Sequence, residues 1–354
     1  MIKQKIKAIK DIQSVPCVRI LFPTHRTAPD NQQDPILLKN LIRETERRLQ
    51  NEFGKSVSGE LVSKLNQMAS DYNFQTSLDG LAMYVCQETQ EIIRIPLPVE
   101  ERIVIDGTFA TRDLYRSMHH QEAYFILHLQ INEAKLYDAY GNRISTEVRN
   151  EGFPYLNDVP EPDDEPENPS EAEKVRIRTF LQRTDKRLQD FLMEHAARMV
   201  VVATEPIQAI LKEITEDKNV FIGYTTPPGQ PNLSDMAKKA WIVVEEWIAR
   251  EKERAKEELA DAVNDQRFAS DLNDIWRAVN EGRGDILLVE EGYFQPAHFK
   301  EGHISLDEPA DASGRIDDIV DEIIELCIEK RGSVVFIPDG ELPTFDRIGL
   351  ITRY

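Results

Sequence analysis

The 354-residue sequence has few cysteines and no long apolar run, and both shortages exclude classes of protein. No apolar stretch approaches the roughly 18 residues that cross a bilayer, so no membrane-spanning helix is expected. The basic start, 1–10, leads into polar sequence, so a secretory signal is not expected either. The three cysteines, Cys17, Cys86 and Cys327, lie far apart and form no C-x-x-C pair. These features predict reduced, semi-buried thiols in a cytoplasmic protein.

The sequence also lacks the common motifs of nucleotide and hydrolase chemistry. It contains no P-loop, no dinucleotide-binding fingerprint and no G-x-S-x-G elbow, so NTP hydrolysis and common hydrolase mechanisms have no support. Two histidine pairs, His119–His120 and His298 with His303, have neither the i, i+4 helical spacing nor the cysteine partners of a zinc site. We therefore expect no metal and no other cofactor.

Negative charge is concentrated in two parts of the chain. The formal net charge is −20, but residues 151–173 hold nine acids and no base, and residues 281–354 hold 17 acids and 7 bases. The rest of the chain is nearly neutral, so a local basic face could still meet RNA phosphates. DNA is not an expected partner.

Alternating apolar runs and amphipathic segments predict an α/β protein of three domains. An α/β N-terminal domain covers residues 1–105, a middle α/β domain covers 106–260, and an α/β/α C-terminal domain with a mostly parallel sheet covers 261–354. Within the first domain, 17–22 reads as a buried strand, and two helices are expected, one opening at Pro35 and one over 58–69. The middle domain should contain a hairpin over 124–140.

Two segments carry the candidate binding residues. A helix from about residue 170 to 195 has an apolar stripe and six bases within 14 residues: Lys174, Arg176, Arg178, Arg183, Lys186 and Arg187. Offsets of 7 and 11 place Arg176, Arg183 and Arg187 on one face. In the first domain, Arg43, Arg47 and Arg48 should lie on the outside of a helix. Each set could bind RNA phosphates or form an ordinary solvated face.

The acidic run 151–173 precedes the basic helix and contains five prolines, so we expect a long solvated loop there. Three roles stay open for it. It could be a flexible linker, it could mask the basic helix electrostatically until RNA displaces it, or it could dock on a basic ribosomal protein.

Several stretches resemble the class-I peptide release factor and Pelota superfamily, and above all its bacterial archaeo-eukaryotic release-factor-like relatives. In the C-terminal part these are W-R-A-V-N-E-G (276–282), D-I-L-L-V-E-E (285–291), V-V-F-I (334–337) and G-L-I-T-R-Y (349–354). F-A-T-R-D-L (109–114) is similar to the family's junction between its first and second domains. The resemblance implies a ribonuclease-H-like middle domain and a third domain with the fold of kink-turn-binding ribosomal proteins.

The family's catalytic tripeptide is missing. Members that release peptides carry a Gly-Gly-Gln loop before the basic helix, where the glycines permit a strained turn and the glutamine positions the attacking water. Here the loop before the basic helix is acidic and has no such motif. Pro228-Gly229-Gln230 is the nearest substitute, but it follows a strand and is flanked by prolines. The family's stop-codon-reading motif is also absent from 30–39, so we predict no catalytic residue.

The leading hypothesis is therefore a non-enzymatic factor that binds the ribosome or a tRNA site in rescue, recycling or silencing. The acidic C-terminal domain would bind a protein partner. The alternative is a hydrolase of peptidyl-tRNA esters, or a metal-dependent ribonuclease, that uses residues outside the family's motif. A third possibility is a small-molecule or general stress-response domain protein that reuses this scaffold, because a fold does not fix a function.

Overall fold

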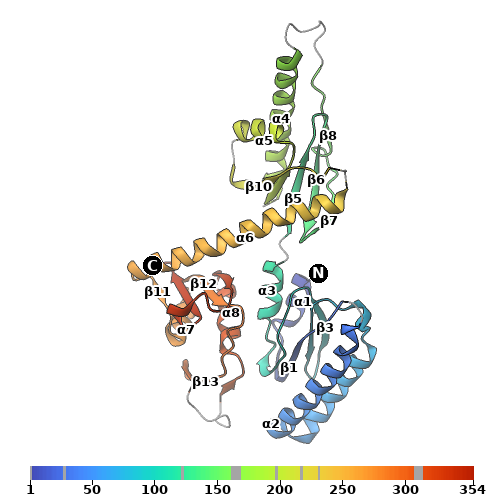
Figure 1. Cartoon of the computed structure of the whole chain (residues 1–354). Coiled ribbons are helices and arrows are strands. Elements are labelled where there is room, and N and C mark those ends of the chain that lie inside the picture. Colours follow the sequence, from blue (N-terminus) through green and yellow to red (C-terminus); the bar gives the residue numbers. More distant parts are fainter. Residues whose placement is uncertain are drawn as a thin grey trace. The chain divides into compact units, whose positions relative to one another are not determined.

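The computed structural model describes residues 2–26, 29–120, 123–160, 169–195, 198–215, 218–229, 232–306 and 314–354. The chain forms two compact units. The composite unit consists of Met1–His120 and Arg254–Tyr354, and the middle unit is Gln121–Glu253. The predicted α/β class is confirmed, because each unit packs helices against sheets (Figure 1).

The N-terminal part of the composite unit is an antiparallel sheet with helices. Its helices are α1 (Ile2–Ile9), α2 (Asp34–Asp71) and α3 (Arg112–His120), with short 3-10 turns at Asp30–Gln32 and Phe74–Thr76. Its strands are β1 (Gln13–Pro23), β2 (Gly80–Val85), β3 (Gln90–Ile95) and β4 (Arg102–Thr108), in the order β3-β2-β1-β4.

Helix α2 joins the two helices that the sequence predicts. Pro35 lies in its first turn, where the missing N–H is not needed. At Gly54 the backbone leaves helical geometry with φ of 79°, a value that glycine adopts without steric cost. Leu38, Leu49 and Leu65, from both sides of this break, share one core with strands β1 and β2. The break therefore lets both halves of α2 pack on the same sheet.

The middle unit is a mixed sheet with helices on both faces. Its strands are β5 (Ala123–Leu129), β6 (Glu133–Tyr140), β7 (Arg143–Glu147), β8 (Tyr155–Leu156), β9 (Met199–Val202) and β10 (Phe221–Thr225). The order is β10-β9-β5-β6-β7, and β8 pairs with β6. Its helices are α4 (Pro169–Glu194), α5 (Glu205–Ile214) and the first part of α6 (Leu233–Asn264), with a 3-10 turn at Lys218–Val220. The predicted hairpin is β5–β6.

Alternation along the strands assigns the two faces of this sheet. Leu127 and Leu129 of β5 pack with Phe180 and Leu188 of α4, whereas Tyr124 and its alternate neighbours pack with α6. One face of the sheet is thus covered by α4 and α5 and the other by α6 (Figure 1). Helix α4 therefore keeps a side that is turned away from the core.

The C-terminal part of the composite unit contains the last part of α6, α7 (Leu272–Asn280) and α8 (Ile319–Glu329), with a 3-10 turn at Pro343–Phe345. Its main strands are β11 (Phe268–Ala269), β12 (Gly284–Glu290), β16 (Ser333–Ile337) and β17 (Ile348–Thr352), in the order β11-β17-β12-β16. A small sheet is formed by β13 (Ala297–Lys300), β14 (His303–Ser305) and β15 (Arg315–Ile316).

The prediction of a mostly parallel sheet in this part is wrong. Only β12 and β16 pair in parallel, and β17 runs antiparallel both to β12 and to β11. The reason is that β17 returns into the middle of the sheet after β16. The sequence pattern predicts helices over 271–280 and 316–330 and strands over 285–289 and 333–337, and α7, α8, β12 and β16 lie at these positions.

The boundaries between the two units, after residues 120 and 253, differ from the predicted domain boundaries after residues 105 and 260. Residues 106–120 belong to the composite unit, because α3 is bonded to α8, and residues 254–260 pack on the C-terminal sheet. The division into three domains remains a prediction. The cysteines are free and buried, and none of the described helices is long and apolar enough to cross a membrane.

Candidate functional site

The predicted basic helix is α4, and Lys174, Arg178 and Arg183 on it pair with acids. At its first turn Lys174 pairs with Glu171 of the same helix, with Nζ and Oε2 3.5 Å apart. Arg178 forms an ion pair with Glu213 of α5. Lys186 is exposed and Arg176 is half-buried. The helix is therefore a mixed-charge surface in this structure.

Arg183 and Arg187 meet a short segment that follows β8. Arg183 Nη1 donates to Asp158 Oδ1 at 2.6 Å, and the Tyr155 hydroxyl donates to the same oxygen at 2.5 Å. The Arg187 guanidinium lies 3.7 Å from the centre of the Tyr155 ring, a cation–π contact. Tyr155 in turn stacks on Phe180 of α4, with ring centroids 5.2 Å apart. The structure thus brings two of the predicted residues together around one tyrosine.

The candidate residues of the first domain lie on α2. Arg43 is exposed, and Arg47 pairs with Glu44 one turn earlier, with Nη2 and Oε1 2.5 Å apart. Arg48 does not lie on the outside as predicted. It donates to the Ile103 carbonyl at 3.1 Å and to Asp317 Oδ2 at 2.5 Å.

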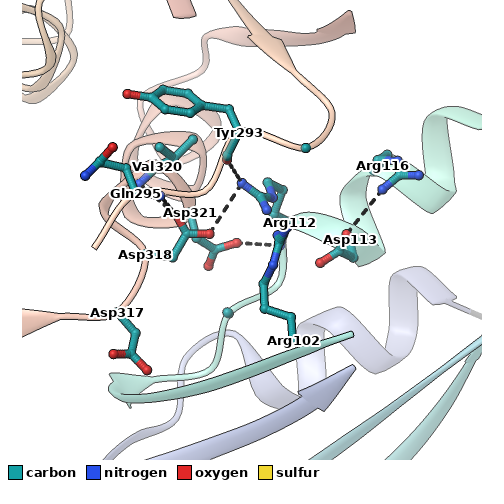
Figure 2. Close-up of polar contacts among 12 residues, drawn as sticks. Arg102, Arg112, Asp113, Arg116, Tyr293, Gln295, Asp317, Asp318, Val320 and Asp321 are labelled. Atoms are coloured by element: carbon teal, nitrogen blue, oxygen red, sulfur yellow. Dashed lines mark hydrogen bonds and ion pairs between the residues drawn. The ribbon is translucent and has the colours of Figure 1, made fainter. Parts of the chain in front are cut away.

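Asp317 belongs to a buried polar cluster that sequence reasoning missed (Figure 2). The cluster joins the junction segment 102–116 to the start of α8, some 200 residues later in the chain. At its centre is Arg112, the first residue of α3, whose side chain is 0% exposed. Its Nη1 donates to the Tyr293 carbonyl and lies 3.3 Å from Asp318 Oδ2. Arg112 Nε and Nη2 have no hydrogen-bond partner among the described residues.

Acids on α8 bind the backbone of the junction. The Asp321 carboxylate accepts the Arg112 N–H at 2.7 Å and the Thr111 N–H at 3.1 Å, so it caps the start of α3. Asp317 Oδ2 accepts the Ile105 N–H at 2.9 Å. In return, both carboxylate oxygens of Asp106 accept the Asp317 N–H at 3.0 Å. These contacts bind α8 to the sheet of the N-terminal part.

A second arginine completes the cluster. Arg19 of β1 is 1% exposed, and its Nη1 donates to Asp113 Oδ2 at 2.8 Å. Burial alone would raise the pKa of Asp113, but the charges of Arg19 and Arg112 outweigh it and lower that pKa. Asp113 is therefore ionised at neutral pH, and it holds Arg19 in the interior.

Other acids of the cluster have raised pKa values. Burial, and then the charge of Asp317, raise the pKa of Asp106 to about 8. Burial, and then the charge of Asp318, raise the pKa of Asp321 to about 7. Burial also raises the pKa of Glu325, to about 9, with Asp321 as the next cause. We therefore expect the cluster to release protons as the pH rises from about 7 to 9.

A cleft of about 170 Å³ adjoins this cluster, and Arg102, Asp113, Arg116 and Glu291 are among the residues that line it. Arg116 Nε lies 3.2 Å from Glu291 Oε2, and the Arg102 guanidinium lies 4.7 Å from the centre of the Phe294 ring. The cleft is smaller than the roughly 300–1,000 Å³ of typical small-molecule sites. We assign no ligand to it.

The remaining sequence candidates give no catalytic arrangement. Gly229 lies between β10 and α6, and the predicted substitute glutamine, Gln230, lies outside the described residues. His298 and His303 are on neighbouring strands, β13 and β14. Within the described ranges, no group of three or more His, Cys, Asp or Glu side chains could hold a metal ion.

Residues 123–283 match the family model of bacterial archaeo-eukaryotic release factor family 3. The predicted resemblance to the release-factor-like proteins is confirmed. The match is somewhat less than half of the chain, and it includes β5 to β10, α4, the whole of α6 and α7. The basic helix, α4, therefore lies inside the matched region.

Similar solved structures have low identity and low TM-scores. An archaeal translation termination factor, aRF1, is 15% identical over 100% of this chain and 97% of that chain, with a TM-score of 0.26. A chain from a model of ribosome-bound archaeal Pelota and ABCE1 is 11% identical over 100% and 94%, with a TM-score of 0.43. S. cerevisiae Dom34, a translation termination-like factor, is 10% identical over 80% and 82%, with a TM-score of 0.37. No curated protein gives a significant match.

Proposed function

We propose that this protein is a ribosome-associated translation factor that binds ribosomal RNA or tRNA through α4 and does not catalyse peptide release. The observation that carries the proposal is the release-factor family match over residues 123–283, which contains the basic helix. The sequence has no Gly-Gly pair at any position, so the family's hydrolytic loop cannot form. Its action would be to occupy a site on the ribosome in rescue, recycling or silencing.

The three parts of the chain would have separate tasks. The N-terminal part, with Arg43 and Arg47, would face the decoding side, and α4 would face the acceptor end of tRNA. The C-terminal part would bind a protein, because its residues 281–354 carry ten more acids than bases. Asp317, Asp318 and Asp321 are already used inside the composite unit, so a protein partner would meet the remaining, exposed acids, such as Glu329.

Reversing the charge of three bases on α4 should abolish ribosome binding. The variant is Arg176→Glu, Arg183→Glu and Arg187→Glu together, and co-sedimentation with purified ribosomes at low and moderate salt is the measurement. For the unaltered protein, binding should weaken with salt, and each lost phosphate contact should reduce the salt slope by about 0.7–0.9.

The control makes the same change of charge away from α4, at the exposed Lys39, Lys238 and Arg277. It should bind nearly as well as the unaltered protein, and thermal unfolding should show that both variants are folded. Equal loss of binding in the two variants would mean that net charge alone decides. If the unaltered protein sediments with no vacant, initiating or stalled ribosome, the translation function is wrong.

Peptide release should be absent. Incubating the protein with ribosomes that carry labelled peptidyl-tRNA should give no more free peptide than buffer, and Gln230→Ala should change nothing. Release that depends on Gln230 would instead support the peptidyl-tRNA hydrolase alternative. Magnesium-dependent cleavage of ribosomal RNA or tRNA in the same reactions would support the ribonuclease alternative.

A further inference from the structure

Two hydrogen-bond donors from separate elements converge on a single anionic oxygen beside α4. They are Nη1 of Arg183, at 2.6 Å, and the hydroxyl of Tyr155, at 2.5 Å, and the oxygen is Oδ1 of Asp158. A carboxylate oxygen and a phosphate oxygen accept such hydrogen bonds in the same way. The position of this oxygen therefore marks a place where α4 and β8 together can hold an anion.

Packing holds one of the two donors, Tyr155, in place. Tyr155 is 6% exposed, pairs with Ala134 through the β8–β6 ladder, and stacks on Phe180. Its ring carries the Arg187 guanidinium at 3.7 Å, so a second positive charge lies next to the same tyrosine. Because this ring is buried, the Tyr155 hydroxyl and the Arg187 charge beside it are in place before any partner arrives, and the exposed Arg183 adds the second donor.

The Asp158 carboxylate, which occupies this anion position in the structure, is by contrast weakly held. The side chains of Arg183 and Asp158 are 43% and 56% exposed, so water screens their ion pair. Asp158 is also one of the nine acids of the 151–173 run, which contains no base. A nucleic acid offers several phosphates at once and releases counterions on binding, so it can replace one exposed carboxylate.

We propose that Asp158 occupies a phosphate-binding position formed by Arg183, Tyr155 and Arg187, and that RNA binds α4 by displacing it. This inference rests on the proposed function, since it assumes that α4 binds RNA. It assigns the acidic run a masking role at one defined residue. It also assigns Tyr155 a role in binding, as the second donor to the phosphate.

The test measures the affinity of the full chain for a fluorescently labelled RNA hairpin and for vacant ribosomes. Asp158→Asn and Asp158→Ala should each raise the affinity by about fivefold at low salt, because a like charge is removed from beside the phosphate. The gain should disappear when Arg183 is replaced by Gln. In the Asp158→Ala background, Tyr155→Phe should weaken binding again, because it removes the second donor while it keeps the stacked ring.

Asp190→Asn is the matched control, since Asp190 is an exposed acid on the same helix. If it raises the affinity as much as Asp158→Asn does, the effect is one of general charge and the masking role is wrong. If the unaltered protein binds and both Asp158 variants bind equally well or more weakly, the masking role is wrong while the proposed function stands. Absence of binding in every variant would remove both.

Discussion

Replacing Arg112 by methionine should lower the free energy of unfolding of the composite unit by about 3–5 kcal/mol. Methionine keeps much of the length and apolar contact of the side chain but removes its charge. Asp318, 2% exposed, and Asp321, 3% exposed, would then be buried acids without their central cation. The Tyr293 carbonyl would also lose its donor. For a unit of this size, the loss corresponds to a fall of about 6–20 °C in melting temperature.

The same substitution at Arg47 is the control. Arg47 is 67% exposed and, among the described residues, pairs with Glu44 of its own helix, so Arg47→Met should leave the melting temperature nearly unchanged. A further variant tests the cause of the loss. Asp318→Asn added to Arg112→Met should recover part of the lost stability, since it removes one of the uncompensated acids. Equal melting temperatures for Arg112→Met and Arg47→Met would show that the cluster does not stabilise the unit.

Stability of the composite unit can be followed separately from that of the middle unit. The chain has three tryptophans, and only Trp276 lies in the composite unit. In a Trp241→Phe and Trp247→Phe background, fluorescence during denaturant unfolding reports the surroundings of Trp276. Trp276 packs edge-on against Phe299, with ring centroids 4.7 Å apart, so its emission should change when this part unfolds.

Secondary structure in this chain follows closely from local sequence pattern. The hairpin β5–β6 alternates between two cores with period two, and α4 has an apolar stripe, so both are recognisable without any partner. The two halves of α2 were predicted as separate helices, one opening at Pro35 and one over 58–69, and the break at Gly54 lies between them. The direction of β17 could not be predicted, since the pattern of a buried strand is the same in either direction.

The buried cluster escaped prediction because its charges resemble surface charges. The acids Asp318, Asp321, Glu322 and Glu325 recur at i, i+3, i+4 and i+7, which is the spacing of a solvated helix face. In the structure this face of α8 contacts the junction, through Thr108, Thr111 and Arg112. The partners lie about 200 residues apart in sequence, so no local pattern could pair them. One indication of the cluster was present in the sequence: α8 carries a row of acids in addition to a complete apolar face.

The function of the basic helix α4 could not be predicted from the sequence for a different reason. Its six bases and their spacing were visible in the sequence, but the acids that pair with Arg178 and Arg183 come from α5 and from the segment after β8. Because such pairs form between elements, the sequence could not decide between a solvated face and an RNA-binding face. The cation–π contact between Arg187 and Tyr155 was equally hidden.

The composite unit should lose stability as the pH rises from 6 to 9. An aspartate side chain ordinarily has a pKa of 3.8, whereas in the folded chain the pKa of Asp106 is about 8 and that of Asp321 is about 7. Between the ordinary and the raised values, the folded chain holds protons that the unfolded chain has released. Glu325 behaves in the same way, with its pKa raised to about 9. The stability from these groups is therefore fully present below about pH 4 and is lost as the pH passes through about 7 to 9. Asp113, with its lowered pKa, acts oppositely, but only in acid.

The measurement is denaturant unfolding of the composite unit at pH 6, 7, 8 and 9, with Trp276 as the reporter. The free energy of unfolding should fall by more than about 1 kcal/mol over this range, since one pKa unit is worth about 1.4 kcal/mol. Asp106→Asn should make the dependence less steep, because the amide cannot ionise while its oxygen can still accept the Asp317 N–H, and Asp321 and Glu325 still titrate. Asp274→Asn, at a side chain that is 59% exposed, should leave the dependence unchanged. A flat curve for the unaltered protein, or equal slopes for it and Asp106→Asn, would contradict proton uptake by the cluster.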